Sequence, residues 1–172
     1  GGTVQDAASF PLSIYKRGVK WIYFPTTFPA QCDSCIGSKT SINLNDKKNL
    51  LGTFFPPARV NIDINFLYSL PSIELRAGLG EILHYFCFSG EKRLAILENL
   101  NFNELNKTNT LRKLIIESLA TKKELIEIDE FDEKERNVFN FGHTFAHALE
   151  SISDYSIPHG IAVAYGIDIA NY

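Results

Sequence analysis

The chain has 172 residues, 45% hydrophobic and 22% charged, which suits one compact domain or two small ones with a hydrophobic core. A formal net charge of -3 gives no basic excess, which argues against nucleic acid as the main partner. No apolar run approaches the roughly 20 residues of a membrane helix, and the opening residues do not form a signal peptide. We therefore expect no membrane partner and a cytoplasmic location.

The first part of the chain is predicted to be α/β. The apolar, β-rich run VKWIYF at 19–24 predicts a buried strand, which Pro25 ends. Pro11 should kink or interrupt the helical pattern around it. In chain order we expect a helix over 4–17, a strand over 19–24, a short helix over 26–32, a long polar loop over 34–49 and a strand over 59–64.

After residue 66 the pattern becomes helical. Leu111, Leu114, Ile115 and Leu119 recur at the spacing of one face of an amphipathic helix. The fold class predicted is therefore α/β followed by all-α, with the change near residue 66. Helices are expected over 72–88, 90–99, 108–128, 133–149 and 160–171.

The three cysteines include one C-x-x-C pair, Cys32 and Cys35. Such a pair is redox-active in some proteins and half of a zinc ribbon in others, but a ribbon needs a second pair that this sequence lacks. We interpret the cysteines as buried or incidental thiols of a reducing compartment.

Histidines and a glutamate form the first candidate site. His143 and His147 lie four apart, so on a helix their imidazoles share one face. His159 begins a later predicted helix, and Glu81 lies within the apolar helix 72–88. A catalytic zinc commonly takes three ligands of the His and carboxylate kind and polarises an oxygen of the substrate. The residues thus indicate a divalent metal site; the alternative is core histidines and an exposed glutamate.

Two further stretches suit anions. The segment 37–40 (GSKT) is basic and rich in hydroxyl groups, although it lacks the glycine spacing of a P-loop, and a plain solvated loop is the alternative. Gly1 and Gly2 precede a predicted helix with Asp6 in its first turn, a weak signal for a nucleotide pyrophosphate site.

Taken together and in order, eight short motifs resemble the 3-dehydroquinate synthase family. Each motif alone is short, but the family carries all of them in this order, and they extend over essentially the whole chain. They lie at 1–6, 15–18, 25–27, 33–40, 48–52, 80–82, 140–144 and 159–160.

The resemblance implies an NAD-dependent cyclase that also needs a divalent metal, zinc or cobalt. The family converts 3-deoxy-D-arabino-heptulosonate 7-phosphate to 3-dehydroquinate and phosphate in the shikimate pathway, which leads to aromatic amino acids. A hydroxyl is oxidised transiently, phosphate is eliminated, the ketone is reduced again, and the ring closes by an aldol reaction. Residues 1–66 would then end a Rossmann-like NAD-binding domain, and residues 67–172 would form a helical metal- and substrate-binding domain. We expect further elements before Gly1 and after Tyr172.

By position, the resemblance makes Glu81, His143 and His159 the metal ligands and moves His147 to the substrate phosphate. Arg17 matches an arginine that reaches the active site of a neighbouring subunit, which implies a homodimer. Besides His147, the catalytic positions are Lys39, Lys122, Arg136 and Asn140, and the substrate-binding positions are Asp33, Asn49, Arg17 and His84. The NAD-binding positions are Gly2, Asp6, Thr26, Thr27, Asp33, Lys39 and Lys48.

Departures from the family pattern keep the substrate open. The family usually has lysine at His84, three residues after Glu81 and so on the same helix face. It also usually reads Gly-Gly-Lys-Thr at 37–40 and Gly-Asp at 5–6. The alternatives are a sister cyclase that makes 2-deoxy-scyllo-inosose or a valiolone-type ring, a non-catalytic metal-binding or interface fragment, and an iron-dependent alcohol dehydrogenase of related fold.

Overall fold

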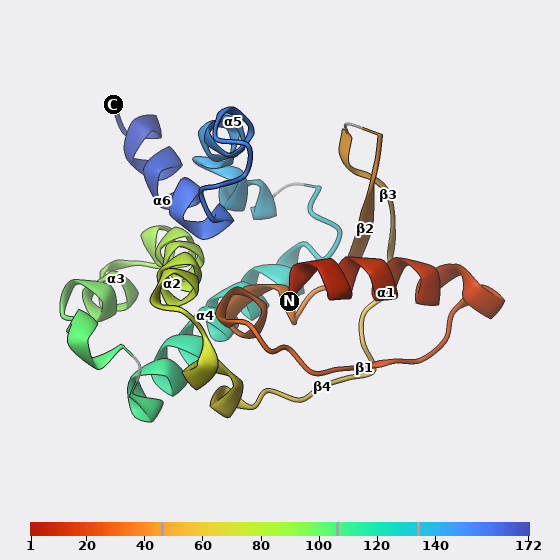
Figure 1. The fold of residues 1–172 in the computed structure, drawn as a ribbon, viewed down its shortest axis with the longest axis horizontal. Helices are drawn as coiled ribbons and strands as arrows, with labels where there is room; N and C mark the ends of the chain where they lie inside the picture. Colours follow the sequence, from red (N-terminus) through yellow and green to blue (C-terminus); the bar gives the residue numbers. More distant parts are fainter. Residues whose placement is uncertain (46, 106, 134) are drawn as a thin grey trace.

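The computed structural model describes residues 1–45, 47–105, 107–133 and 135–172, except for the side chains of Lys48 and of residues 135–137. Its architecture is α/β followed by all-α, as predicted (Figure 1). The α/β part contains α1 (Gly2–Ile14), the two-residue strands β1 (Ile22–Tyr23) and β4 (Arg59–Val60), and the hairpin strands β2 (Lys39–Leu44) and β3 (Lys47–Phe54).

Helix α1 passes through Pro11 without breaking and ends at Ile14, three residues before the predicted end. A 3₁₀ turn, Tyr15–Arg17, follows, with Lys16 in the left-handed region at φ 49°. Strands β1 and β4 pair in parallel, Ile22 opposite Arg59, so both predicted strands form but are shorter than expected. The predicted short helix over 26–32 forms two residues later, as a helical turn over 28–34 that is π-helical at Ala30–Ser34.

The predicted polar loop over 34–49 is wrong, because most of it is strand. β2 and β3 form an antiparallel hairpin that projects from the α1 side of the molecule, with Lys39 opposite Phe54 (Figure 1). The side chains of Thr40 and Thr53 hydrogen-bond across the pair, with their oxygens 2.7 Å apart. Main-chain pairing and cross-strand hydroxyl groups hold these strands, so hydrophobic alternation gave no sign of them.

The second part, as far as its residues are described, contains five α-helices. They are α2 (Ser72–Cys87), α3 (Glu91–Glu98), α4 (Thr108–Ile128), α5 (His143–Ile152) and α6 (His159–Ala170). Short 3₁₀ turns lie at Ile64–Ser69, Phe102–Glu104 and Glu135–Asn140.

The predicted helix over 133–149 is wrong at its start. A 3₁₀ turn spans Glu135–Asn140, and α5 begins only at His143. The cause is Gly142, which adopts φ 77° in the left-handed region and so ends any continuous helical path through it. This break separates α5 from the preceding turn, so that His143 is the first residue of α5.

Helix α6 crosses both α2 and α5 in main-chain contact. A methyl group on Gly80 of α2 would lie 1.8 Å from the Gly160 carbonyl oxygen, and one on Gly160 would lie 1.8 Å from the Ala77 carbonyl oxygen. At the other crossing, a methyl group on Gly166 would lie 2.2 Å from the Gly142 carbonyl oxygen. These glycines allow the helices to approach more closely than any side chain permits. Glu81 and His159 directly adjoin the first crossing.

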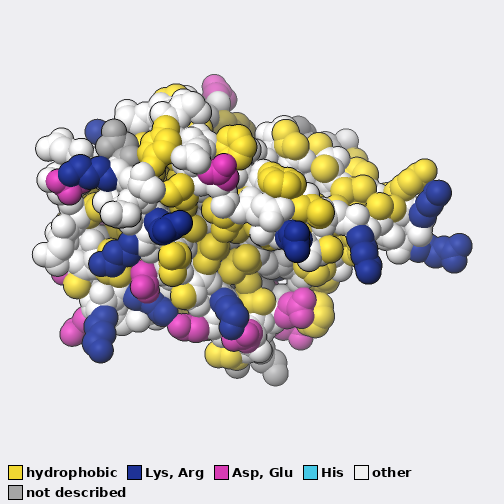
Figure 2. All heavy atoms as spheres, turned by 90° about the horizontal axis from the view of Figure 1, so that it is seen from below, with side chains coloured by type: hydrophobic (Ala, Val, Ile, Leu, Met, Phe, Trp, Pro, Cys, Tyr) yellow, Lys and Arg dark blue, Asp and Glu magenta, His cyan; other side chains and the backbone are white. Residues whose placement is uncertain are grey.

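The main hydrophobic core packs α2 and α4 against the π-helical turn, with Phe28, Phe86 and Leu111 fully buried. Cys32 and Cys35 are buried free thiols in this region, and burial raises the pKa of Cys35 to about 12, which fits the interpretation of the pair as inert. In the described part of the chain, no helix is both long and apolar enough to cross a membrane. The face in Figure 2 mixes hydrophobic and charged side chains and shows no histidine.

Candidate metal and substrate site

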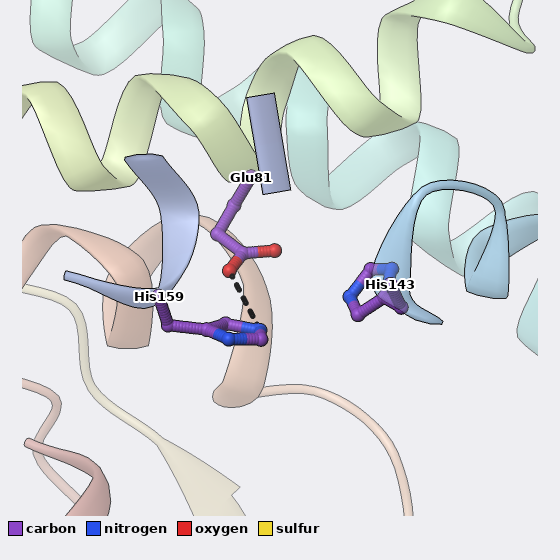
Figure 3. Close-up of side chains that lie close together, drawn as sticks. All are labelled: Glu81, His143 and His159. Atoms are coloured by element: carbon purple, nitrogen blue, oxygen red, sulfur yellow. Dashed lines mark ion pairs between the residues drawn. The ribbon is translucent and has the colours of Figure 1, made fainter. Parts of the chain in front are cut away.

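Three predicted ligands come together from three helices. Glu81 of α2, His143 of α5 and His159 of α6 each offer a ligand atom, and these atoms all lie within 4.8 Å of one another. In Figure 3, Glu81 and His159 face each other and His143 approaches from α5. The His159 Nε2 atom lies 3.4 Å from the Glu81 Oε1 atom. These three residues are therefore placed so that they could hold one metal ion between them.

The chemistry of this cluster fits a divalent cation. Two ligands that are each about 2.0–2.1 Å from a tetrahedral zinc ion lie about 3.3 Å apart, close to the separation of the Glu81 and His159 atoms. Glu81 is only 5% exposed, and burial, followed by the charge of Asp33, raises its pKa to about 8. Burial, followed by the neighbouring His159, lowers the pKa of His143, and its Nδ1 atom is buried without a hydrogen-bond partner among the described residues. A cation would compensate these groups.

The alternative of satisfied core histidines with an exposed glutamate does not describe this cluster. Glu81 is buried, whereas the His159 side chain is 42% exposed, so the cluster opens to solvent on the His159 side. A catalytic zinc site keeps one coordination position open for water or substrate. The opening at His159 supplies such an approach.

His147 adjoins the cluster without being one of the three predicted ligands. Its ring lies 5.7 Å from that of His159 at 25°, in a stacked arrangement, and 5.9 Å from that of His143. Glu150, one turn further along α5, places its Oε1 atom 3.1 Å from the His159 Nδ1 atom. Sequence reasoning missed Glu150, although His143, His147 and Glu150 follow the i, i+4, i+7 spacing of one helix face.

A second polar cluster joins Asp33 to Lys122. The Lys122 ammonium donates to the Asp33 side-chain Oδ1 at 2.7 Å and to its main-chain oxygen at 2.9 Å, and Tyr85 donates its hydroxyl to the same Oδ1. Burial alone raises the pKa of Asp33, but the Lys122 charge outweighs it and holds that pKa below its usual value. Two residues predicted for one site are thus directly paired, and Tyr85 is a partner that the sequence did not indicate.

His84 lies between the two clusters, buried to 1% exposure. Its ring packs 4.7 Å from that of His143 and 5.6 Å from those of Tyr85 and Phe139. Burial, then the neighbouring His143, lowers the pKa of His84 to about 4, so the ring is neutral at pH 7. Where the family pattern has a lysine, this chain therefore places an uncharged aromatic ring.

Lys39 and Asn49 lie together on the hairpin. Both line a hollow of about 390 Å³ between β2 and β3. The Lys39 ammonium forms an ion pair with Asp132, and Asn49 accepts a hydrogen bond from the Ser41 hydroxyl at 2.9 Å. None of the three predicted metal ligands lines this hollow, so it is distinct from the histidine cluster.

Of the predicted NAD-binding positions, Gly2 and Asp6 lie in the first half of α1 and Thr27 lies beside its start. Gly2 opens the helix, and a methyl group added to it would meet nothing within 4 Å. A methyl group on Gly1 would lie 3.0 Å from the Thr27 side chain, so Thr27 adjoins the helix start. Asp6 lies in the second turn of α1 rather than in the first as predicted, because the helix already begins at Gly2, and partial burial raises its pKa.

The remaining predicted positions are dispersed. Arg17 ends the exposed turn after α1 at φ 66°, and Asn140 ends the 3₁₀ turn before α5. The side chains of Lys48 and Arg136 lie outside the described residues, so their assignments stay predictions.

Solved structures of similar fold are cyclases. The 2-epi-5-epi-valiolone synthase of Streptomyces hygroscopicus, solved with NAD⁺ and Zn²⁺ bound, superimposes with a TM-score of 0.89 at 27% identity over 97% of this chain and 47% of its own. A 2-deoxy-scyllo-inosose synthase complexed with carbaglucose-6-phosphate, NAD⁺ and Co²⁺ superimposes with a TM-score of 0.86 at 29% identity. The match covers 99% of this chain and 48% of that one. The fold is therefore that of the sugar-phosphate cyclases.

Sequence relatives identify the family within this class. Sequence models of the 3-dehydroquinate synthase N-terminal and C-terminal regions match residues 1–77 and 78–172. The 3-dehydroquinate synthase of Dictyoglomus thermophilum is 44% identical over 174 residues, covering 100% of this chain and 49% of its own. That of Saccharolobus solfataricus is 42% identical over 170 residues, covering 97% and 48%. The chain belongs to the 3-dehydroquinate synthase family, and it spans about half the length of the curated relatives it matches.

Proposed function

We propose that the protein is a 3-dehydroquinate synthase, an NAD- and metal-dependent lyase of the shikimate pathway that acts in the cytoplasm. It would convert 3-deoxy-D-arabino-heptulosonate 7-phosphate to 3-dehydroquinate and phosphate. The convergence of Glu81, His143 and His159 in a member of this family is the observation that carries the proposal. Identities of 42–44% to named 3-dehydroquinate synthases favour this substrate over that of a sister cyclase.

Glu81, His143 and His159 would hold the divalent ion, zinc or cobalt, and the ion would polarise an oxygen of the substrate next to the reacting carbon. NAD would accept a hydride from the substrate carbon that bears the oxidised hydroxyl, as the hydroxyl loses its proton, and would later return the hydride to that carbon. Gly2, Asp6, Thr26 and Thr27, in α1 and in the segment after β1, are among the residues proposed to bind it. The 27–29% identical cyclases solved with NAD⁺ and Zn²⁺ or Co²⁺ support both cofactors.

The cations of this chain suit a substrate that carries both a carboxylate and a phosphate. Lys122 is held in place by Asp33, so its ammonium is fixed beside the buried Glu81 region before substrate binds. Lys39 and Arg136 would supply further positive charge, and His147, stacked on His159, would face the phosphate. Fixed cations lower the free energy of the anionic species that elimination creates.

We further propose that the protein works as a homodimer, because Arg17 matches the arginine that, by the family resemblance, reaches the active site of the neighbouring subunit. The turn Tyr15–Arg17 supports this role, since it leaves the Arg17 side chain exposed.

The proposed activity is tested by phosphate release. The whole protein, supplied with NAD and zinc or cobalt, should release phosphate from the heptulosonate 7-phosphate. His143→Ala should lower kcat at least about 100-fold, because it removes a metal ligand. Exposed Glu127, paired with Lys123 at 2.6 Å, provides the matched control: Glu127→Gln should keep full activity. Failure of the wild type to release phosphate, with both cofactors present, would refute the proposal.

His84 supports one second candidate, a sister cyclase with another sugar phosphate. A neutral ring replaces a cation there, so an anionic group that the lysine would bind has no counter-charge at this position. Glucose 6-phosphate is the first substrate to compare, since its carba analogue is bound in one similar structure. His84→Lys should improve kcat/KM for the heptulosonate if the residue selects substrate; unchanged preference would remove His84 from that role.

A further inference from the structure

Helix α5 contributes a second acidic side chain to the metal cluster, and this one contacts a ligand. Glu150 lies near the end of α5 and is only 5% exposed. Its Oε1 atom lies 3.1 Å from the Nδ1 atom of His159, while the Nε2 atom of the same ring lies 3.4 Å from the Glu81 Oε1 atom. Each nitrogen of His159 therefore faces a different buried carboxylate.

We infer that Glu150 is a positioning residue that orients His159 and determines which of its ring nitrogens carries the proton, leaving the other free to bind a metal. The inference rests on the proposed metal site. A buried carboxylate needs a donor, and the His159 Nδ1–H group is in place to supply it. With the proton on Nδ1, the Nε2 atom carries a lone pair directed to the same side as Glu81. The carboxylate also makes the imidazole a better electron donor to a cation at Nε2.

His159 needs this support more than the other ligands do. Its side chain is 42% exposed, so packing restrains only part of the ring. It is also the first residue of α6, directly after Pro158, where the preceding turn offers no neighbouring side chain of the same helix. The stacked His147 ring limits tilt, but stacking does not select between the two ring nitrogens. The Glu150 hydrogen bond selects the nitrogen.

His147, Glu150 and His159 also form a group of three possible ligand atoms within 4.8 Å of one another. A second ion there would make Glu150 a ligand and compete for the Nδ1 atom of His159. The Glu150–His159 separation of 3.1 Å is a normal hydrogen-bond length, which favours a proton between them. The number of ions per chain distinguishes the two arrangements.

The experiment measures zinc binding by the whole protein, stripped of metal and titrated against a chromophoric chelator. Glu150→Gln keeps the shape and an accepting oxygen but removes the charge, and it should raise the zinc Kd about tenfold; Glu150→Ala should raise it about 100-fold. Ser153→Ala is the matched control. It removes a hydrogen bond to the Glu150 main-chain oxygen, leaves the carboxylate untouched, and should keep the wild-type Kd.

Cobalt substitution gives a second measurement that does not depend on activity. The visible absorption of the Co²⁺ protein should shift in Glu150→Gln, because the electron-donating strength of His159 changes. If Glu150→Ala does not fold, Glu150→Gln alone decides. A Kd within twofold of wild type together with an unchanged cobalt spectrum in Glu150→Gln overturns the inference, and so do two ions per chain. Failure of the wild type itself to bind zinc refutes the proposed function instead.

Discussion

The helix crossing at the metal cluster and the β2–β3 hairpin position their polar residues in different ways. At the crossing, main chain touches main chain through Gly80 and Gly160, and Glu81 and His159 are the next residues along. On the hairpin, Lys39 is held by an ion pair with Asp132, and its side chain is 49% exposed. The predicted metal ligands Glu81 and His159 thus lie beside a crossing fixed by backbone packing, whereas the predicted substrate residue Lys39 on the hairpin is fixed by a solvent-exposed side-chain contact.

This difference indicates a division of tasks. Backbone packing cannot adjust without moving whole helices, which suits an ion that requires defined ligand distances. Surface ion pairs contribute little stability and exchange readily with other partners, which suits residues that must change partners when a substrate binds. Substitutions in the two regions should therefore differ strongly in their effect on stability.

The largest effect is expected at the crossing. Gly80→Ala places a methyl group 1.8 Å from the Gly160 carbonyl oxygen, so α2 and α6 must separate, and the free energy of unfolding should fall by about 3–5 kcal/mol. Zinc affinity should fall as well. Gly2→Ala is the control, since it too is a helical glycine but has open space around it, and it should change stability by less than about 1 kcal/mol. Equal urea midpoints for the two variants would contradict this view of the crossing.

The buried pair Asp33–Lys122 should come next. Lys122→Met leaves the Asp33 carboxylate without its cation and should cost about 3 kcal/mol at pH 7, the low end for breaking a buried pair, because Asp33 retains some contact with solvent. The pH dependence should also change sign. In the wild type the folded pKa of Asp33 is lowered, so its contribution is present above about pH 4 and lost as pH falls further.

In Lys122→Met the burial of Asp33 is unopposed, its folded pKa rises, and the penalty should shrink as pH falls from 7 toward 5. Urea unfolding at several pH values measures both curves. Lys123→Met, which removes a neighbouring exposed cation on α4, should leave the wild-type pH dependence unchanged. Parallel curves for wild type and Lys122→Met would show that the pair does not control the Asp33 charge.

The smallest effect on stability is expected on the hairpin. A double-mutant cycle of Lys39→Ala and Asp132→Asn should give a coupling of at most about 1 kcal/mol, the usual range for exposed ion pairs. The same Lys39→Ala variant should lower kcat/KM for phosphate release at least about tenfold if Lys39 binds substrate. A coupling free energy well above about 1 kcal/mol would show that the Lys39–Asp132 contact is as rigid as the helix crossing, and would contradict the difference between the two regions.

The sequence predicted the helical part of this fold better than the hairpin. Strong 3.6-residue periodicity, such as that of Leu111, Leu114 and Ile115, marks a helix by itself, and α4 has the predicted bounds. The strands 39–44 and 47–54 carry polar residues on both faces, so their pairing shows in the main-chain register and in cross-strand contacts such as Thr40–Thr53, not in a hydrophobic pattern. The break before α5 depends on the positive φ of Gly142, which a helical pattern running through the residue conceals.

The candidate site shows the same limit. The four-residue spacing of His143 and His147 indicated that they share a helix face, and the order of the motifs pointed to Glu81 and His159. The predicted ligands could therefore be chosen from the sequence. Their proximity depends on a crossing between helices that are distant in the chain, and spacing cannot show it. Glu150 was missed because its partner, His159, belongs to another helix, and Tyr85 because its contact with Asp33 is likewise between distant segments.

The Gly80–Gly160 crossing also has a consequence for folding kinetics. It joins helices that are far apart in sequence, and the entropy of closing that stretch of chain must be lost before the contact is made. The predicted metal ligands Glu81 and His159 should therefore come together late, after α2 and α6 have docked. Added zinc should slow unfolding strongly and leave the rate of folding nearly unchanged, so that loaded protein is long-lived mainly because it opens slowly.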